Sequence, residues 1–144
     1  MNQMTIRTFQ ATDQLRVIAL WRECGLVAPQ NDPAADIARK LAWQPELLFV
    51  GESGGAIVAT VMAGYEGHRG WINYLAVAPT CQKCGHGRAM MQHAETALRL
   101  LGCPKINLQV RSTNREVIQF YERVGFREDA VLSMGKRLIV DASK

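Results

Sequence analysis

The sequence predicts a single domain of mixed α+β structure, in which helices flank one central sheet. Period-2 alternation of apolar residues, typical of strands, recurs in several short segments, and apolar spacing of three and four residues, typical of helices, recurs in several longer ones. No low-complexity tract, internal repeat or linker interrupts this alternation of elements. We therefore expect a twisted, mixed but mostly antiparallel sheet of about six to seven strands with about four helices, built from residues 1–144.

The chain is expected to begin with a strand and a helix. Residues 4–9 alternate as a strand, and Thr12 or Asp13 can cap the helix that follows, which ends before Gly25. The residues expected to face the core in this helix are Leu15, Ile18 and Ala19, with Trp21 as a further candidate.

A second helix and three consecutive strands follow. Asp32 can cap a helix that has Pro33 at its first position, where the missing N–H of proline would have been unpaired anyway. The apolar segments 46–52 and 56–66 flank Ser-Gly-Gly, which predicts a hairpin because glycine tolerates positive φ. Residues 71–79 form a third antiparallel strand, closed by a proline.

Helices separate the remaining strands. Residues 85–101 carry apolar side chains at helical spacing, and residues 105–110 alternate as a strand. That strand must run parallel to 71–79, through a right-handed crossover, if both belong to one sheet. Asn114 can cap a last helix, and residues 125–139 are expected to form two final short strands.

Composition and charge narrow the class of protein. The chain is 48% hydrophobic and 21% charged, with a formal net charge of +4 and a pI near 9.1. Its basic residues are scattered and form no run of the kind expected in a nucleic-acid-binding arm. No segment approaches the roughly 18 apolar residues of a membrane span, and the N-terminal stretch lacks the pattern of a signal peptide. We expect a cytoplasmic protein that binds an anionic ligand, and neither nucleic acid nor a membrane.

The four cysteines predict neither a disulfide framework nor a metal site. Cys81 and Cys84 have the spacing of a metal-binding pair, but zinc would need two more ligands, and the other cysteines and histidines show no paired spacing. We therefore expect no metal, and reduced thiols as in the cytosol. A redox role for Cys81 and Cys84 stays open.

Residues 82–87, Gln-Lys-Cys-Gly-His-Gly, are expected to form a glycine-rich turn that leads into a helix. The first N–H groups of a helix have no intrahelical partners and point, with the positive end of the helix dipole, toward such a turn. The turn therefore suits a phosphate group. It does not match a P-loop, because no Lys-Ser/Thr follows, nor a dinucleotide fingerprint, because Met90 stands where a third glycine is needed. A plain turn into a helix is the alternative.

This turn resembles the diphosphate-binding motif of the GCN5-related N-acetyltransferases (GNAT), Gln/Arg-x-x-Gly-x-Gly/Ala. Residues 74–79, YLAVAP, are similar to the fourth strand of that family, and residues 114–126 match its Asn followed by Tyr-x-x-x-Gly-Phe. The order of elements agrees over nearly the whole chain, and NDP, GYEGHRG, GCPKI and SMGKRLI resemble the YpeA-type bacterial members. The resemblance implies a single-domain GNAT fold and an acyltransferase that uses acetyl-CoA as its acetyl donor.

The resemblance also implies roles for individual residues. The backbone N–H of Val77 or a neighbour would polarise the thioester carbonyl, and Tyr121 would give its proton to the leaving thiolate. From spacing alone, Tyr121 is more typical of core packing, and it is the resemblance that favours the catalytic role. Because Cys84 and His86 replace the family's usual basic and aliphatic residues, part of the charge for the phosphates is expected from other side chains. The implied acetyl-CoA-binding residues are Leu75, Ala76, Val77, Gln82, Lys83, Cys84, Gly85, His86, Gly87, Arg88, Asn114 and Tyr121.

The general base and the acceptor are left open by the sequence. Gln109 stands where members that acetylate ribosomal proteins have a glutamate, and an amide cannot accept a proton. Glu66 is the first candidate for the base, with His68 and water as alternatives, although a solvated hairpin is the more common role for charged loop side chains of this kind. We predict an N-acetyltransferase in which a primary amine of a small molecule or peptide attacks the thioester directly. A non-catalytic acyl-CoA-binding regulatory module is the alternative, and a homodimer stays open.

Overall fold

The computed structural model describes residues 3–139, which fall into two compact units divided between Asn107 and Leu108. The elements of the first unit are β1 (Thr5–Thr8), η1 (Ala11–Asp13), α1 (Gln14–Glu23), α2 (Pro33–Ala42), η2 (Pro45–Leu47), β2 (Leu48–Ser53), β3 (Ala56–Tyr65), β4 (Gly70–Val77), η3 (Pro79–Cys81), α3 (His86–Leu100) and β5 (Ile106–Asn107). The second unit contains α4 (Arg115–Arg123).

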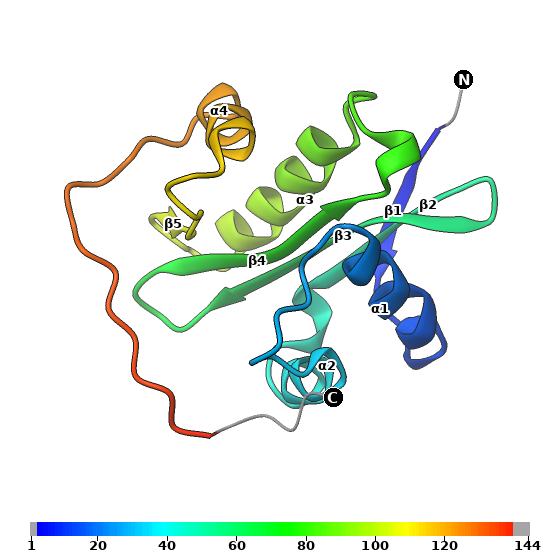
Figure 1. Ribbon diagram of the computed structural model, residues 1–144, viewed down its shortest axis with the longest axis horizontal. Coiled ribbons are helices and arrows are strands. Elements are labelled where there is room, and N and C mark those ends of the chain that lie inside the picture. The colour runs from blue at the N-terminus through cyan, green and yellow to red at the C-terminus, as the bar shows by residue number, and fades with distance from the viewer. Residues whose placement is uncertain (1–2, 140–144) are drawn as a thin grey trace. The chain divides into compact units, whose positions relative to one another are not determined.

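The sheet of the first unit has the order β1-β2-β3-β4-β5 (Figure 1). The pairs β1–β2, β2–β3 and β3–β4 are antiparallel, and β4 pairs with β5 in parallel. Gly54 and Gly55 close the β2–β3 hairpin with φ values of 60° and 80°, as the Ser-Gly-Gly sequence predicts. The predicted fold class is therefore confirmed: a mixed, mostly antiparallel sheet with four helices.

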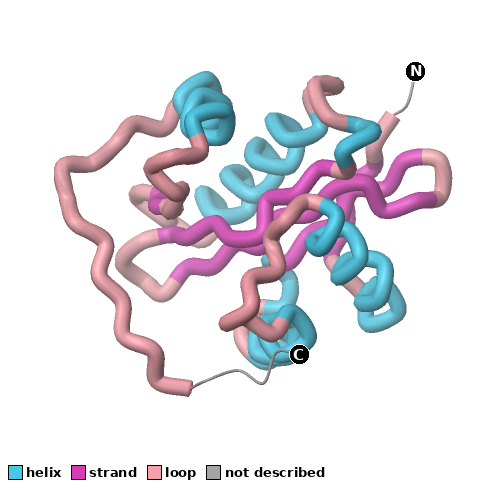
Figure 2. Tube along the Cα trace, viewed as in Figure 1, coloured by secondary structure: helices cyan, strands magenta, loops and turns pink. Residues whose placement is uncertain are grey.

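Residues 3–139 contain five strands, fewer than the predicted six to seven. The strand expected at 105–110 is reduced to Ile106–Asn107, and residues 125–139, expected as two strands, contain none. Figure 2 draws this last segment as loop. Apolar alternation alone does not make a strand, because the backbone also needs a neighbouring strand with which to pair. Leu132, in the middle of the segment, is 90% exposed.

Helices α1 and α2 lie on one face of the sheet, and α3 lies on the other (Figure 1). Helix α1 buries Val17, Leu20 and Trp21, whereas Leu15, expected in the core, is 84% exposed. Both sets of residues satisfy the helical spacing of three and four, so the pattern alone could not choose between the two faces. Burial of the large Trp21 ring settles the choice.

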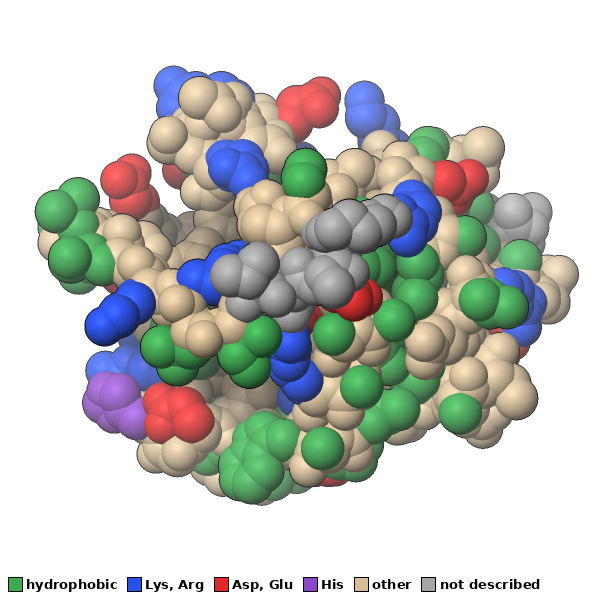
Figure 3. Space-filling model, turned by 60° about the horizontal axis from the view of Figure 1, so that its bottom comes forward, with side chains coloured by type: hydrophobic (Ala, Val, Ile, Leu, Met, Phe, Trp, Pro, Cys, Tyr) green, Lys and Arg blue, Asp and Glu red, His purple; other side chains and the backbone are tan. Residues whose placement is uncertain are grey.

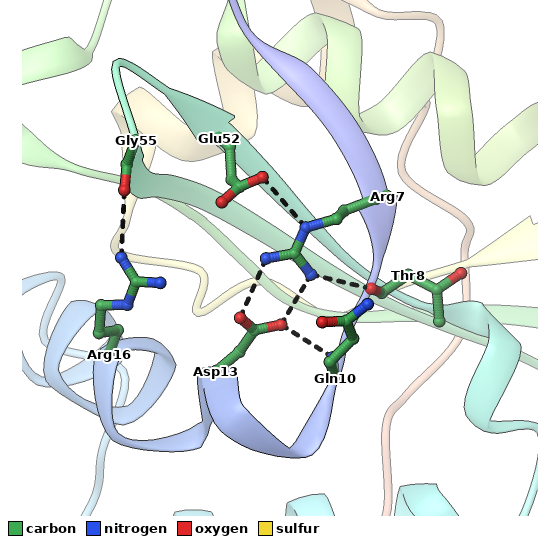
Figure 4. A network of polar contacts seen from close by, with 7 residues as sticks. All are labelled: Arg7, Thr8, Gln10, Asp13, Arg16, Glu52 and Gly55. Carbon is green, nitrogen blue, oxygen red and sulfur yellow. Dashed lines mark hydrogen bonds and ion pairs between the residues drawn. The ribbon is translucent and has the colours of Figure 1, made fainter.

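An ion-pair network joins β1, β2 and the start of α1 (Figure 4). The guanidinium of Arg7 donates to both carboxylate oxygens of Asp13, at 2.8 and 3.0 Å, and to Glu52 Oε1 at 3.1 Å. The backbone N–H of Gln10 donates to Asp13 Oδ2 at 2.8 Å. Asp13 occupies the N-cap position of α1 as predicted, but its side chain makes no cap hydrogen bond there and serves this network instead.

We expect Asp13→Asn to lower the free energy of unfolding by about 2 to 3 kcal/mol, because it leaves the Arg7 charge without its main partner. Hydrogen bonding to Arg7 holds the pKa of Asp13 below its ordinary value. The stabilisation is therefore present above the unfolded-state pKa of about 4 and is lost as the pH falls through the folded-state pKa. Urea unfolding between pH 2 and 7 should show a weaker acid dependence in Asp13→Asn. Glu23→Gln is the control, and an unchanged acid dependence in Asp13→Asn would contradict the assignment.

Three properties of the described residues concern the features of membrane-spanning, metal-binding and nucleic-acid-binding proteins. Among the described residues, no helix has the length and apolar character needed to cross a membrane. Residues 3–139 contain no cluster of three or more His, Cys, Asp or Glu side chains arranged to hold a metal ion. On the face drawn in Figure 3, Lys and Arg side chains are scattered among other types and form no continuous stripe.

Candidate active site

Strand β4 carries a bulge near its middle. Its register with β3 is regular up to Asn73 and again from Ala76, so that Tyr74 and Leu75 together lie opposite Val61. Tyr74 has a φ of 52°, in the left-handed region that residues other than glycine rarely adopt. The bulge therefore holds a strained residue near the middle of β4, the fourth strand in the sheet order.

Contacts from both the side chain and the backbone hold Tyr74 in this conformation. Its ring stacks on Trp21, with 3.7 Å between centroids and an interplanar angle of 11°. Trp21 Nε1 donates to Thr60 Oγ1 at 2.9 Å, and that hydroxyl donates to the Tyr74 carbonyl at 2.8 Å. The Tyr74 hydroxyl donates to Asp36 Oδ2 at 2.6 Å. A strained residue persists where its surroundings over-determine it, and such residues are concentrated at functional sites.

The end of β4 directs backbone groups away from β3. Ala78 N donates to Val58 O at 2.8 Å, so the alternation of an antiparallel ladder points the N–H and C=O of Val77 to the opposite edge. The Val77 carbonyl accepts hydrogen bonds from Cys24 Sγ at 3.3 Å and from Gln82 Nε2 at 3.0 Å. Within residues 3–107, β5 pairs only with the first two residues of β4, so no strand of this unit covers the edge near Val77.

The turn at residues 82–85 leads into α3 with an open helix end. Gly85 is the N-cap residue with a φ of 86°, Lys83 has a φ of 66°, and no side chain caps the helix. The first intrahelical bond runs from Ala89 N to Gly85 O at 3.0 Å, so the N–H groups of residues 86–88 precede the helical ladder. A Cβ placed on Gly85 would meet no atom within 4 Å. Open space beside such a row of donors fits a diphosphate.

Most of the predicted acetyl-CoA-binding residues form one continuous stretch, from the end of β4 to the first turn of α3. They are Leu75, Ala76, Val77, Gln82, Lys83, Cys84, Gly85, His86, Gly87 and Arg88. Two of these residues are too buried for their side chains to contact a ligand as expected. Ala76 pairs with Thr60 of β3 and is 3% exposed, and the ring of His86 is buried, which leaves only its backbone at the turn.

Two predicted residues, Asn114 and Tyr121, belong to the second unit. Asn114 is the N-cap of α4, and its Oδ1 accepts a hydrogen bond from Val117 N at 3.4 Å, as predicted. The Tyr121 ring is buried, with edge contacts to Phe120 and Phe126 at centroid distances of 5.2 and 5.6 Å. Burial raises the pKa of Tyr121 to about 12, so its hydroxyl remains protonated at neutral pH.

Glu66 and His68 lie in the hairpin between β3 and β4, at the far end of β4 from Val77. The two carboxylate oxygens of Glu66 accept hydrogen bonds from His68 N at 3.0 Å and Arg69 N at 2.9 Å. At about 3.3 Å per residue, the length of β4 from Gly70 to Val77 is about 23 Å. The structure thus does not bring the candidate base Glu66 close to Val77.

A cleft of about 610 Å³ lies between α2 and the bulge of β4. Among its lining residues are Asp36, Lys40, Trp43, Met62, Asn73 and Tyr74. The four-residue spacing of Asp36 and Lys40 puts both side chains on one face of α2, and this could have been seen in the sequence. Their proximity to β4 could not, because Tyr74 is 38 residues from Asp36.

The sequence of this chain is similar to those of known acetyltransferases. The Acetyltransferase (GNAT) family model matches residues 14–126. An acetyltransferase from Yersinia enterocolitica is 47% identical over 138 residues, which cover 96% of this chain and 98% of that protein. Another, from Sodalis glossinidius, is 46% identical over 139 residues, covering 96% and 98%.

A solved structure has a similar fold. Ard1 from Thermoplasma volcanium has a TM-score of 0.74 and 26% identity, covering 88% of this chain and 84% of that one. The names of these relatives do not test the YpeA-type branch, which stays a prediction.

Proposed function

Because the chain belongs to the acetyltransferase (GNAT) family, we propose that it transfers the acetyl group of acetyl-CoA to a primary amine, which attacks the thioester directly. The observation that carries this proposal is the open N-terminal end of α3, in the same stretch of chain as the outward-facing backbone of Val77. The helix end takes the diphosphate, and the edge of β4 takes the arm that carries the thioester.

The donor side relies mainly on backbone groups. The N–H groups of residues 86–88 donate to the diphosphate, and the positive end of the α3 dipole adds to their effect. Lys83, before these groups in sequence, and Arg88, at their end, supply positive charge that Cys84 does not. Gln82 fixes the turn to the end of β4 through its hydrogen bond to the Val77 carbonyl.

The acyl transfer needs an oxyanion donor, a proton donor and a proton acceptor. The Val77 N–H donates to the thioester oxygen as negative charge develops on it. The amine nitrogen bonds to the carbonyl carbon, the C–S bond breaks, and Tyr121 gives its proton to the departing sulfur. The amine proton passes to water or to Asp36 of the cleft, since Glu66 is engaged in its hairpin.

A non-catalytic acyl-CoA-binding module is the second candidate. It is favoured by Gln109, whose amide contacts the Ser133 hydroxyl and offers no proton acceptor, and by the hydrogen bonds that engage Glu66. Release of free thiol from acetyl-CoA, measured with a panel of small amines, amino acids and peptides, distinguishes the two. We expect amine-dependent release well above the hydrolysis background. Binding of acetyl-CoA without release for any amine would support the module instead, and absence of binding would contradict both.

A further inference from the structure

We propose that the cleft between α2 and β4 takes acceptor amines that also carry a carboxylate, with Lys40 receiving the carboxylate and Asp36 the amine. This inference rests on the proposed function and names the substrate class of that reaction. It starts from Lys40, a buried cation in the wall of an open cleft.

The charge of Lys40 is not neutralised by a neighbouring side chain. The residue is 9% exposed, its Nζ donates to the backbone oxygen of Ala63, and no carboxylate of the described residues forms an ion pair with it. An ammonium group has three donors, and a buried charge is normally paired because its desolvation is costly. Desolvation lowers the pKa of Lys40, and the charge of Glu46 offsets this only in part. An anionic ligand would therefore supply the charged partner that the Lys40 ammonium lacks among the described side chains.

The Lys40 ammonium lies against the backbone of β3. A Cβ at Gly64 would lie 3.5 Å from Lys40 Nζ, so this Nζ lies directly over the glycine. An apolar side chain of similar length would line the same wall without the desolvation cost of a charge. A ligand carboxylate offsets that cost with a charge-assisted hydrogen bond, which is stronger than a neutral one.

Asp36 offers the complementary charge one helical turn away. It precedes Lys40 by four residues on α2, so the two side chains lie on one face with about 5 to 6 Å between their Cβ atoms. Its carboxylate accepts hydrogen bonds from the Tyr74 hydroxyl at 2.6 Å and from Arg39 Nη1 at 3.1 Å. A carboxylate has about four acceptor sites, and the Asp36 side chain is 27% exposed, so a substrate ammonium can still bind it.

The charges around the cleft disfavour an acceptor that is only cationic. Among the described lining residues, Arg39 and Lys40 are cationic and Asp36 is anionic, and Arg39 already forms an ion pair with Asp36. A substrate with one amine and one carboxylate, such as an amino acid, satisfies Asp36 and Lys40 at once. Trp43, which is 66% exposed in the same wall, offers an apolar surface to the rest of such a molecule.

The test compares matched acceptors by thiol release from acetyl-CoA: amino acids, their amides and their decarboxylated amines, over several side chains. We expect kcat/KM to be at least about tenfold higher for the carboxylate than for the amide. Lys40→Met should reduce this preference at least about tenfold, mainly through KM, and change activity on the amides less than about threefold. Arg99→Met removes an exposed cation from α3, on the other face of the sheet, and should keep the preference.

A second variant and a second measurement cover the cases in which Lys40→Met does not fold or turnover is too slow to compare. Lys40→Gln retains a donor for the Ala63 carbonyl, and it replaces Lys40→Met if that variant does not fold. Calorimetry with N-acetyl amino acids and their amides measures the same preference for the product, independently of turnover. Equal use of carboxylates and amides by the wild-type protein, or a preference that survives in a folded Lys40 variant, would overturn this inference and leave the proposed function intact. No thiol release with any amine would overturn both.

Discussion

Replacing Gly87 with valine is expected to raise the dissociation constant for acetyl-CoA at least about a hundredfold in a protein that remains folded. Gly87 is the second residue of α3, and a helical Cβ points toward the N-terminus of its helix. The added side chain would therefore stand over the N–H groups of residues 86–88. Hydrogen bonds to a charged group contribute about 1.5 to 3 kcal/mol each, so the loss of two accounts for a hundredfold or more.

Calorimetry with acetyl-CoA and with CoA measures this effect. Ala34→Val is the matched control, because Ala34 is the second residue of α2 and reports what valine costs at that helical position. Lys83→Ala should weaken binding about tenfold or less, since it removes one charge and no backbone donor. A dissociation constant within about threefold of the wild-type value in folded Gly87→Val would show that the turn does not hold the diphosphate.

Tyr121→Phe is expected to lower kcat about a hundredfold or more, with little change in melting temperature or acetyl-CoA affinity. The substitution removes one oxygen and keeps the ring that contacts Phe120 and Phe126. If the hydroxyl protonates the departing sulfur, its loss affects the transition state alone. Thiol-release kinetics together with thermal unfolding separate this effect from a loss of packing.

The raised pKa of Tyr121 also predicts how the folding stability of the Tyr121→Phe variant depends on alkaline pH. Burial raises this pKa to about 12, above the value near 10 of an unfolded chain, so the unfolded state loses the proton first as the pH rises. The contribution of Tyr121 to the free energy of unfolding is therefore fully present below about pH 10 and is lost between about pH 10 and 12. The Tyr121→Phe variant should not show this loss. Tyr65→Phe, at a hydroxyl that donates to Gly67 O, is the control. Wild-type turnover in Tyr121→Phe would remove the residue from the mechanism.

Elements whose causes lie within a few residues could be predicted from the sequence. Asp32 accepts hydrogen bonds from Ala34 N and Ala35 N and has Pro33 at the first helical position, as its pattern indicates. The glycine-rich turn at residues 82–87 is similarly local, because its glycines and the helix end that they open are contiguous. The same reasoning found Asn114 as a helix cap.

Features decided by distant contacts could not be predicted in this way. The sequence predicts Asp13 as a possible helix cap, but its carboxylate binds Arg7 instead. This partner depends on how β1 packs, which the local sequence does not reveal. The bulge at Tyr74 depends on Trp21 and Thr60, which no local pattern connects. The expected strands at 125–139 failed for a related reason, since alternation gives no information about a pairing partner.

Under the proposed function, the bulge of β4 lies between a donor half and an acceptor half that use different kinds of group. The donor half uses main-chain N–H groups, which nearly any sequence with the two glycines supplies. The acceptor half uses side chains of α2, such as Asp36 and Lys40, whose exchange leaves those N–H groups untouched. The proposal therefore implies that substitutions in α2 change the choice of acceptor without altering the donor groups. Tyr74 is the exception, because it lines the cleft and also shapes the strand that ends at Val77, so a substitution there would alter both halves in one step.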